Sequence, residues 1–275
     1  MIRIRACEGF DELEECVQLQ IATWGYDDTD AIPRKTFLLA QKIGGQVIGA
    51  FDTDSSSESV EKPSETLIGF AMSLPGIKSR GGEPQPYLHS HMLAVRETHR
   101  NRGIGAELKW EQRREALGRG IRHMEWTFDP LEIKNAFLNI HRLGATASEY
   151  RVDFYGVSSS RLQGGLPTDR LVAVWELDSP RVEGVLTQRP AASYAIQELI
   201  HVPASIYEWK ANDTNRNRAL AVQLENRQKF QEAFSRGLAV LGFSRDLHGN
   251  GVYELGPLPS LKSRIYEEKN ENRRD

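Results

Sequence analysis

The chain has little cysteine, no long apolar run and no excess of charge of one sign. Its two cysteines, Cys7 and Cys16, form no CxxC pair and are too few for a disulfide framework, so neither structural zinc nor a disulfide-stapled secreted fold is expected. No segment approaches the roughly 18 apolar residues of a membrane helix. Residues 1–5 alternate apolar and polar side chains instead of forming the apolar core of a signal peptide. We therefore expect a cytoplasmic protein with no membrane partner.

The two signs of charge nearly cancel. Lys and Arg number 35 and Asp and Glu number 38, which gives a net charge of −3. A domain that grips a nucleic-acid backbone is usually basic, so nucleic acid is not an expected partner. Apolar residues make up 39% and charged residues 27% of the 275 residues, a composition that can bury a core. This length predicts one large domain, or one domain with a substantial appendage.

Strand-like and helix-like segments alternate along the first 178 residues. Apolar periodicity predicts strands over 2–5, 47–51, 67–71, 87–95, 124–128, 146–155 and 171–177. It predicts helices over 11–24, 33–42 and 103–117, and a further helix from 130 that ends at the glycine at 144. The similar strands 47–51 and 67–71 are expected to pair antiparallel, and 53–66 and 75–86 are expected to be loops. The alternation predicts an α/β fold with a mixed sheet.

The remaining residues are expected to form a separate extension. We predict a core domain over 1–178 and an α+β extension over 179–275, with a charged tail from about 262 that frays. Within the extension, the pattern predicts a strand over 194–202, a helix over 215–234 and a hairpin formed by 238–244 and 251–255. Three roles for the extension stay open: enlarging the core, closing the site, and making a contact in a homodimer.

The most informative segment is 93–106, where a strand runs into a basic, glycine-containing turn and then into a helix. The first N–H groups of a helix have no intrahelical partners, and the helix dipole adds partial positive charge there. Gly103 and Gly105 leave room for an anion to approach the backbone, and Arg100 and Arg102 add full charges. The segment therefore indicates a phosphate-binding turn made mainly of main chain.

Three other kinds of turn have similar sequences. The two glycines are equally compatible with a plain tight turn between a strand and a helix. A dinucleotide fingerprint requires a third glycine where Leu108 stands, although Glu125 occupies the place of a ribose-binding acid. The GxxxxGK[ST] string of a P-loop is not present.

The same segment resembles motif A of the GNAT N-acyltransferase superfamily. The family signature [RQ]xxGxG/A is matched by Arg100, Gly103 and Gly105, and the helix ending 142–145 is similar to the family's second motif. The resemblance covers about residues 1–178. It implies a mixed, largely antiparallel sheet flanked by helices. It also implies transfer of an acyl group from acetyl-CoA, or another acyl-CoA, to an amine.

The resemblance assigns roles to residues of this turn. It implies that main-chain N–H groups over 100–106 bind the coenzyme A pyrophosphate, with the closest being those of Arg102, Gly103, Ile104, Gly105 and Ala106. Leu93 and Val95 would pair with the pantetheine arm as a further strand would. The N–H of Val95 or of its neighbour would polarise the thioester carbonyl.

A pair of histidines precedes the turn. Because side chains alternate along a strand, His89 and His91 are expected to share one face. Histidine has the pKa that suits removal of a proton from an amine near neutral pH. The spacing is similar to that of paired histidines in arylalkylamine members of the family. We therefore predict His91 as the base, with His89 acting through water. The competing interpretation is a hydrogen-bonded strand histidine or a surface histidine, and no partner at a convincing spacing suggests a metal site.

The sequence departs from the family in the second motif. Ile140 occupies the slot of a tyrosine that many members use to protonate the leaving thiolate. Tyr150 and Tyr155 are possible substitutes that we read as packing residues. Asn135 is expected to contact the pantetheine. A helix face bearing Lys109, Arg113 and Arg114 is read as solvated charge.

Two further groups were placed near the acceptor. Trp24 and Tyr26 lie in a loop that borders the acceptor pocket in the family. Asp169 and Arg170 precede a strand and are interpreted either as pocket residues or as a surface ion pair. We predict an N-acyltransferase for a small amine or amino acid. The alternatives are a non-catalytic acyl-CoA-binding module and, further off, a dinucleotide-binding oxidoreductase.

Overall fold

A computed structural model describes residues 1–27, 30–53, 65–189 and 194–258. Most of the predicted loop over 53–66 and the whole charged tail from 262 lie outside these residues. Residues 53, 65 and 66 belong to strands.

Ten strands form one mixed sheet with the order β1-β2-β3-β4-β5-β7-β6-β9-β10-β8. The strands are β1 Ile2–Ala6, β2 Gln46–Thr53, β3 Glu65–Arg80, β4 Glu83–Val95, β5 His123–Phe128, β6 Thr146–Arg151, β7 Arg170–Glu176, β8 Glu198–Val202, β9 Leu238–Arg245 and β10 Gly251–Pro257. Among the described residues, β4 and β5 form the one parallel pair, and the other neighbours are antiparallel. The predicted mixed, largely antiparallel sheet is confirmed.

The helices are α1 Gly9–Trp24, α2 Arg34–Lys42, α3 Ile104–Gly118, α4 Ile133–Ala136, α5 Pro180–Leu186, α6 Ile206–Ala211 and α7 Arg216–Ser235. A π-helical segment, Phe137–Arg142, continues α4, and Gly144 (φ +74°) ends it in the left-handed conformation, as its position predicted. Short 3₁₀ turns lie at Glu97–His99 and Arg161–Gln163.

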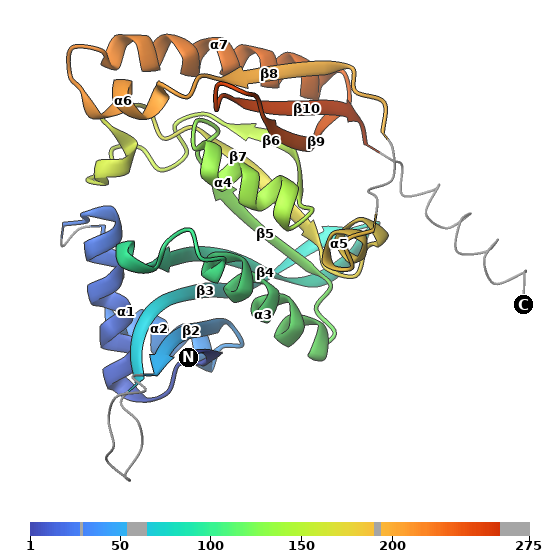
Figure 1. Ribbon diagram of the computed structural model, residues 1–275. Coiled ribbons are helices and arrows are strands. Elements are labelled where there is room, and N and C mark those ends of the chain that lie inside the picture. The colour runs from blue at the N-terminus through green and yellow to red at the C-terminus, as the bar shows by residue number, and fades with distance from the viewer. Residues whose placement is uncertain (28–29, 54–64, 190–193, 259–275) are drawn as a thin grey trace, which may run out of the picture.

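Helices cover both faces of the N-terminal part of the sheet (Figure 1). On one face, α1 and α2 pack against β2, β3 and β4, and Met92 and Ala94 of β4 point into that core. On the other face, α3 packs against the same strands, and Leu93 and Val95 of β4 contact it. This alternation follows from the pleat of the strand. It leaves β4 buried between two helical layers.

The C-terminal extension continues the same sheet. β9 lies beside β6 through the pair Ala147 and Val240, and α7 packs over β6, β8 and β9. Phe230 of α7 stacks on Tyr150 of β6 and meets Tyr253 of β10 edge-on. One apolar core therefore contains residues from both parts of the chain.

One predicted loop is a strand pair instead. The Gly- and Pro-rich segment 75–86 was expected to be a loop, but β3 and β4 form a long antiparallel ribbon with its turn at Gly81 and Gly82 (φ +62° and +90°). Two consecutive positive φ values are typical of a tight hairpin turn. Pro84 and Pro86 are two residues apart, on a stretch of β4 whose pairing with β5 is limited to Leu88 and His89. Proline has no backbone N–H to donate, and an unpaired strand edge tolerates this loss.

Within the described residues, no helix is long and apolar enough to cross a membrane.

Candidate functional site

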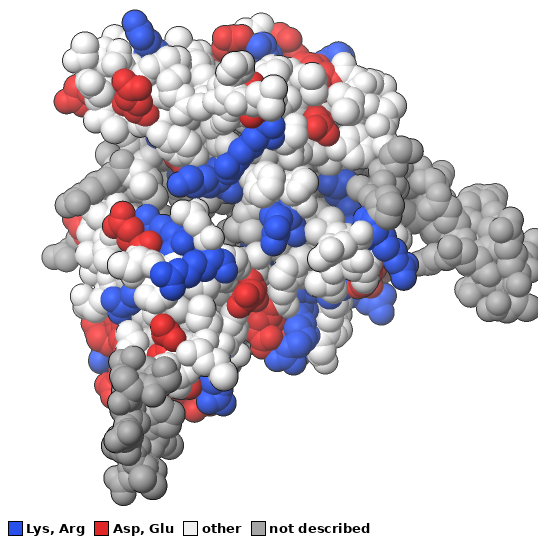
Figure 2. Space-filling model, viewed as in Figure 1, with Lys and Arg blue, Asp and Glu red and all other residues white. Residues whose placement is uncertain are grey.

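β4 and β5 separate at the centre of the sheet. They pair only at Leu88–Met124 and His89–Glu125, and beyond these residues β4 stays with β3 while β5 stays with β7 (Figure 1). A cavity of about 370 Å³ lies at the separation. Its walls come from β4, β5, α3, the α4 segment, the loop after α1 and the loop after β6. Figure 2 shows Lys and Arg side chains gathered on the rims of the hollow between the two halves of the molecule.

A β-bulge lies at His91. Met92 pairs with Met72 and Ser90 pairs with Ser73, so His91 is the extra residue on β4. A bulge interrupts the alternation of side chains along a strand, so alternation does not place His89 and His91 on one face. The two rings nonetheless lie near each other, with centroids 6.1 Å apart. His91 lines the cavity, whereas His89 is half-buried beside it.

Desolvation by the surrounding protein lowers the pKa of both histidines, although the side chain of His91 is exposed in the cavity and that of His89 is half-buried. For His89, the neighbouring His91 lowers the pKa further, whereas the carboxylate of Glu125 opposes the shift. Both imidazoles are therefore biased toward the neutral form, in which one ring nitrogen can accept a proton.

The predicted phosphate-binding turn is an exposed bend that leads into α3. Asn101 (φ +62°) and Gly103 (φ +86°) adopt left-handed conformations. The first hydrogen bonds of α3 run from the N–H groups of Ala106 and Glu107 to the carbonyl of Gly103. The N–H groups of Ile104 and Gly105 precede these bonds. A Cβ atom built on Gly103 would meet no atom within 4 Å, so its outer side is open.

Arg100 and Arg102 differ in what they do at this turn. Arg100 donates from Nε to the carbonyl oxygen of Val95 (3.1 Å) and so ties the turn to the end of β4. Arg102 is exposed. Ala106 was expected to offer a free N–H, but this group is used inside the helix.

The cavity brings some of the predicted residues together and leaves others outside. His91, Leu93 and Asn135 line it, whereas His89, Val95 and the turn do not. The turn adjoins the cavity through Gly105, where a Cβ atom would lie 3.8 Å from Leu93 and from Leu138, both of which are lining residues.

The tyrosine slot of the second motif is closed to the cavity. Ile140 is buried in the apolar core, with 1% of its surface exposed. Tyr150 donates its hydroxyl to Asp169 (2.7 Å) and stacks on Phe230, which confirms a packing role. Tyr155 lines the cavity and shares a hydrogen bond with Thr127 (2.9 Å), so packing alone does not describe it.

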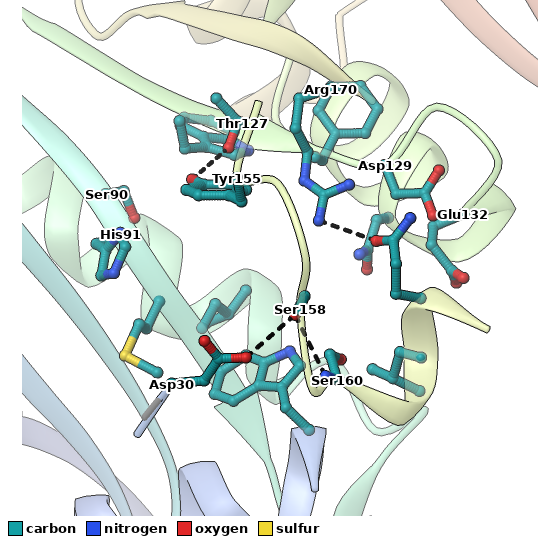
Figure 3. Close-up of a pocket in the computed structure, with 18 of the residues that line it drawn as sticks. Asp30, Ser90, His91, Thr127, Asp129, Glu132, Tyr155, Ser158, Ser160 and Arg170 are labelled. Atoms are coloured by element: carbon teal, nitrogen blue, oxygen red, sulfur yellow. Dashed lines mark hydrogen bonds between the residues drawn. The ribbon is translucent and has the colours of Figure 1, made fainter. Parts of the chain in front are cut away.

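Two loops face each other across the cavity mouth (Figure 3). Asp30, from the loop after α1, accepts hydrogen bonds from the backbone and hydroxyl of Ser159 (both 2.7 Å). Trp24 and Tyr26 stack with ring centroids 5.5 Å apart and line the cavity, as their position predicted. The mouth is thus formed by the loop after α1 and the loop after β6.

Arg170 also lines the cavity. It donates to the carbonyl of Asp169 (2.8 Å) and to Gln163 (3.1 Å), and its guanidinium lies 5.3 Å from the ring centroid of Tyr155. Among the described residues, no carboxylate pairs with it. The pocket interpretation therefore holds for Arg170 but not for Asp169, which is buried away from the cavity and pairs with Arg227.

The interpretation of the α3 charges as a solvated face is wrong for two of the three. Lys109 is 2% exposed and lines the cavity. Arg113 is buried, donates to the carbonyl of Leu177 (2.6 Å) and pairs with Glu183. Only Arg114 is exposed, paired with Glu111. No sequence signal separated Lys109 from its charged neighbours.

No group of three His, Cys, Asp or Glu side chains able to hold a metal ion was found in the part of the chain that the structure describes.

Comparison with family models gives one match. Residues 10–138 match the model of the acetyltransferase (GNAT) family. The matched segment includes the separation of β4 and β5, the turn before α3 and the first part of the α4 segment. The comparison with curated proteins found no match.

Similar solved structures were also found. NAA60 from Arabidopsis thaliana, in complex with acetyl-CoA, is 17% identical, with a TM-score of 0.51 over 65% of this chain and 100% of that chain. The yncA protein from Salmonella typhimurium, solved with its cofactor acetyl-CoA, is 16% identical, with a TM-score of 0.48 over 65% of this chain and 95% of that chain. The first similarity shows that about two thirds of this chain share the fold of that protein.

Proposed function

We propose that the protein transfers an acyl group, acetyl in the first instance, from acyl-CoA to a small amine or amino acid, a proposal supported by the match of residues 10–138 to the acetyltransferase (GNAT) family model. The observation that carries this proposal is the cavity at the separation of β4 and β5, which adjoins an open helix N-terminus and holds a histidine. The site would be filled by two substrates that meet beside His91.

The turn before α3 fits the diphosphate of coenzyme A. The N–H groups of Ile104 and Gly105 have no acceptor within the helix, and the positive end of the α3 dipole lies at the same place. The left-handed conformation of Gly103 bends the backbone at the start of α3, and the space outside Gly103 is open. Arg102 adds a charge at the rim.

The edge of β4 fits the pantetheine arm. The N–H of Arg96 donates to Ile68 of β3 (2.7 Å). Because alternate residues of a strand present their N–H groups to opposite edges, Leu93 and Val95 present theirs away from β3, toward the separation. An extended amide chain can add to such an edge. Asn135 faces the same space from the α4 side.

His91 is proposed as the group that takes the proton from the attacking amine, with His89 acting through water. Since the pKa of His91 is lowered by desolvation, the base form persists below the usual value near 6.5. The rise of kcat/KM with pH should therefore lie below pH 6.5. His91→Gln should lower kcat by about 10²–10⁴-fold and leave acetyl-CoA binding in place.

The acceptor would enter between the two loops at the cavity mouth. Arg170 has no carboxylate partner among the described residues, and a guanidinium binds a carboxylate in two hydrogen bonds. An amino acid would present that carboxylate and leave its amine free to react. This favours an amino acid over a simple amine.

A cytoplasmic location and a homodimer stay predictions.

Two assays test the proposal together. Calorimetric titration with acetyl-CoA and with NAD(P) should give micromolar binding of the former alone. Thiol release should then be measured across a panel of amines and amino acids. Binding without release for every acceptor would support the non-catalytic module, which the buried Ile140 favours. No binding of acetyl-CoA would end the proposal.

A matched pair of glycines checks the turn. Gly103→Ala places a methyl group on the proposed cradle at φ +86°, whereas Gly237→Ala makes the same change at φ +78° in the bend between α7 and β9, also in open space. Gly103→Ala should weaken acetyl-CoA binding by about tenfold or more. Gly237→Ala should leave it unchanged. Equal effects would show that backbone strain, not the cradle, is responsible.

A further inference from the structure

Lys109 is a buried lysine on the wall of the cavity. Its Nζ lies 2.8 Å from Ser90 Oγ, 3.2 Å from Gln112 Oε1 and 3.8 Å from Met124 Sδ. The same nitrogen lies 3.7 Å from the ring centroid of Trp126. These contacts hold the side chain in one position, with its amino group at the point where β4 leaves β5.

No carboxylate pairs with Lys109 among the described residues, and the groups that its amino nitrogen contacts are neutral. A buried charge without a counter-ion is costly, so such a residue is seldom kept for stability alone. Burial lowers the pKa of Lys109 well below its usual value. The charge of Lys109 also lowers the pKa of His89.

The position of Lys109 relates it to the sulfur of the donor. The proposed path of the pantetheine passes Leu93 and enters the cavity beside His91, and Ser90 is the next residue along β4. Since Lys109 contacts Ser90 from α3, its amino group lies on the same side of the sheet as the turn and the α4 segment. A thioester placed against His91 would have its sulfur within reach of this nitrogen.

Protonation of the departing sulfur would assist its release, and neither Tyr155 nor the residue in the family's tyrosine slot is placed to supply that proton. Ile140 stands where many family members use a tyrosine, and it is buried. Tyr155 lies at the acceptor side, where its hydroxyl is shared with Thr127. His91 is assigned to the incoming amine.

We propose that Lys109 protonates the departing thiolate of coenzyme A; this inference rests on the proposed acyl transfer. The amine nitrogen forms a bond to the acyl carbon and loses one proton to His91. The carbon–sulfur bond breaks with its electron pair on sulfur, and one proton moves from Lys109 Nζ to that sulfur. His91 then returns its proton to solvent, and Lys109 takes one from solvent as the products leave.

The first test is made on the binary complex and needs no acceptor. An ammonium group beside the sulfur favours the thiolate, so coenzyme A bound to the wild type should ionise about one pH unit lower than coenzyme A bound to Lys109→Met. Ultraviolet absorbance of the thiolate reports this ionisation. Methionine fills a similar volume among Trp126 and Met124, so the variant is expected to fold. Equal ionisation in the two complexes would overturn the proposal.

The second test separates proton donation from packing. Lys109→Gln keeps a donor for Ser90 but has no proton to give, and it should lower kcat by about 10²-fold or more with little change in the KM for acetyl-CoA. The fall of kcat at high pH in the wild type should be missing from this variant. Arg114→Gln, an exposed change on the same helix, should behave as the wild type. Retention of turnover in Lys109→Gln would contradict the proposal.

Mass spectrometry of the wild type after incubation with acetyl-CoA alone completes the set. An unmodified Lys109 is expected. An acyl group on Lys109 would make it a nucleophile and overturn its role as an acid. If coenzyme A binds no form of the protein, the proposed function fails first, whereas normal turnover in Lys109→Gln removes only the role of Lys109.

Discussion

Two buried lysines of this protein lie in opposite electrostatic surroundings. Lys210 of α6 contacts Asp129 (2.9 Å) and Glu132 (2.8 Å), beside the start of α4. Lys109 of α3 contacts a hydroxyl, an amide oxygen and an indole. Burial alone would lower the pKa of Lys210, but the two carboxylates outweigh it and raise that pKa, whereas burial acts unopposed on Lys109.

We infer from this difference that Lys210 stabilises the fold and that Lys109 has a role in the cavity. A paired charge must stay where it is, because removing it strands its partners. An unpaired one is free to exchange its proton. The same contrast recurs in the arginines: Arg227 pairs with the fully buried Asp169 (2.8 Å), whereas Arg170 lies in the cavity with no carboxylate partner in the described part of the chain.

The largest effect on stability is expected at Lys210. Lys210→Met leaves Asp129 and Glu132 in a buried site without a counter-ion, so the free energy of unfolding should fall by about 3–5 kcal/mol. Urea unfolding measures this. The triple variant Lys210→Met, Asp129→Asn, Glu132→Gln should recover much of the loss. If Lys210→Met alone lowers the free energy of unfolding by less than about 1 kcal/mol, the proposed difference between Lys210 and Lys109 is contradicted.

The next effect is expected at Arg227. Arg227→Met should lower the free energy of unfolding by about 2–3 kcal/mol, because Asp169 keeps only its bonds from Tyr150 and the Asp153 backbone. Arg170→Gln should leave stability nearly unchanged and raise the KM for a carboxylate-bearing acceptor. If Arg227→Met and Arg170→Gln lower the free energy of unfolding equally, the two arginines do not differ in the way that the two lysines do.

Lys109→Met should act on stability in the opposite direction. Removing an unpaired buried amine in favour of an apolar side chain of similar length should leave the free energy of unfolding unchanged or raise it by about 1–2 kcal/mol. Thermal unfolding beside the wild type measures it. A gain in stability with a loss of turnover indicates a residue kept for function, and a loss comparable with that of Lys210→Met indicates a structural residue.

The smallest effect is a pH dependence of these differences. The folded pKa of Lys109 is below its unfolded value near 10.4, so the unfolded chain binds more protons between the two values and wild-type stability gains with rising pH. Any advantage of Lys109→Met should therefore shrink from about pH 7 to about pH 10. Lys210 has a raised pKa, so its contribution is intact below about pH 10.5 and is lost above it. The deficit of Lys210→Met should stay constant over the same range.

Sequence reasoning found the features that local chemistry determines. Gly103 marks the turn because few other residues accept its left-handed backbone, and the hairpin 238–244/251–255 follows from its turn residues. The antiparallel strands and α3 follow from apolar periodicity.

The remaining features depend on contacts between distant segments. Lys109 stands among charged residues of α3, and only the packing of Ser90 and Trp126 against it reveals its burial. The bulge at His91 has no Gly or Pro to announce it. The ribbon formed by β3 and β4 needs a partner strand to turn a proline-rich segment into β-structure.

The most direct test is a crystal structure with a hydrolysis-resistant analogue of acetyl-CoA. The account predicts the diphosphate on the N–H groups that follow Gly103, the acyl carbon beside His91 and the atom that replaces sulfur within hydrogen-bond reach of Lys109 Nζ. An analogue bound elsewhere, with the bend before α3 empty, would contradict it.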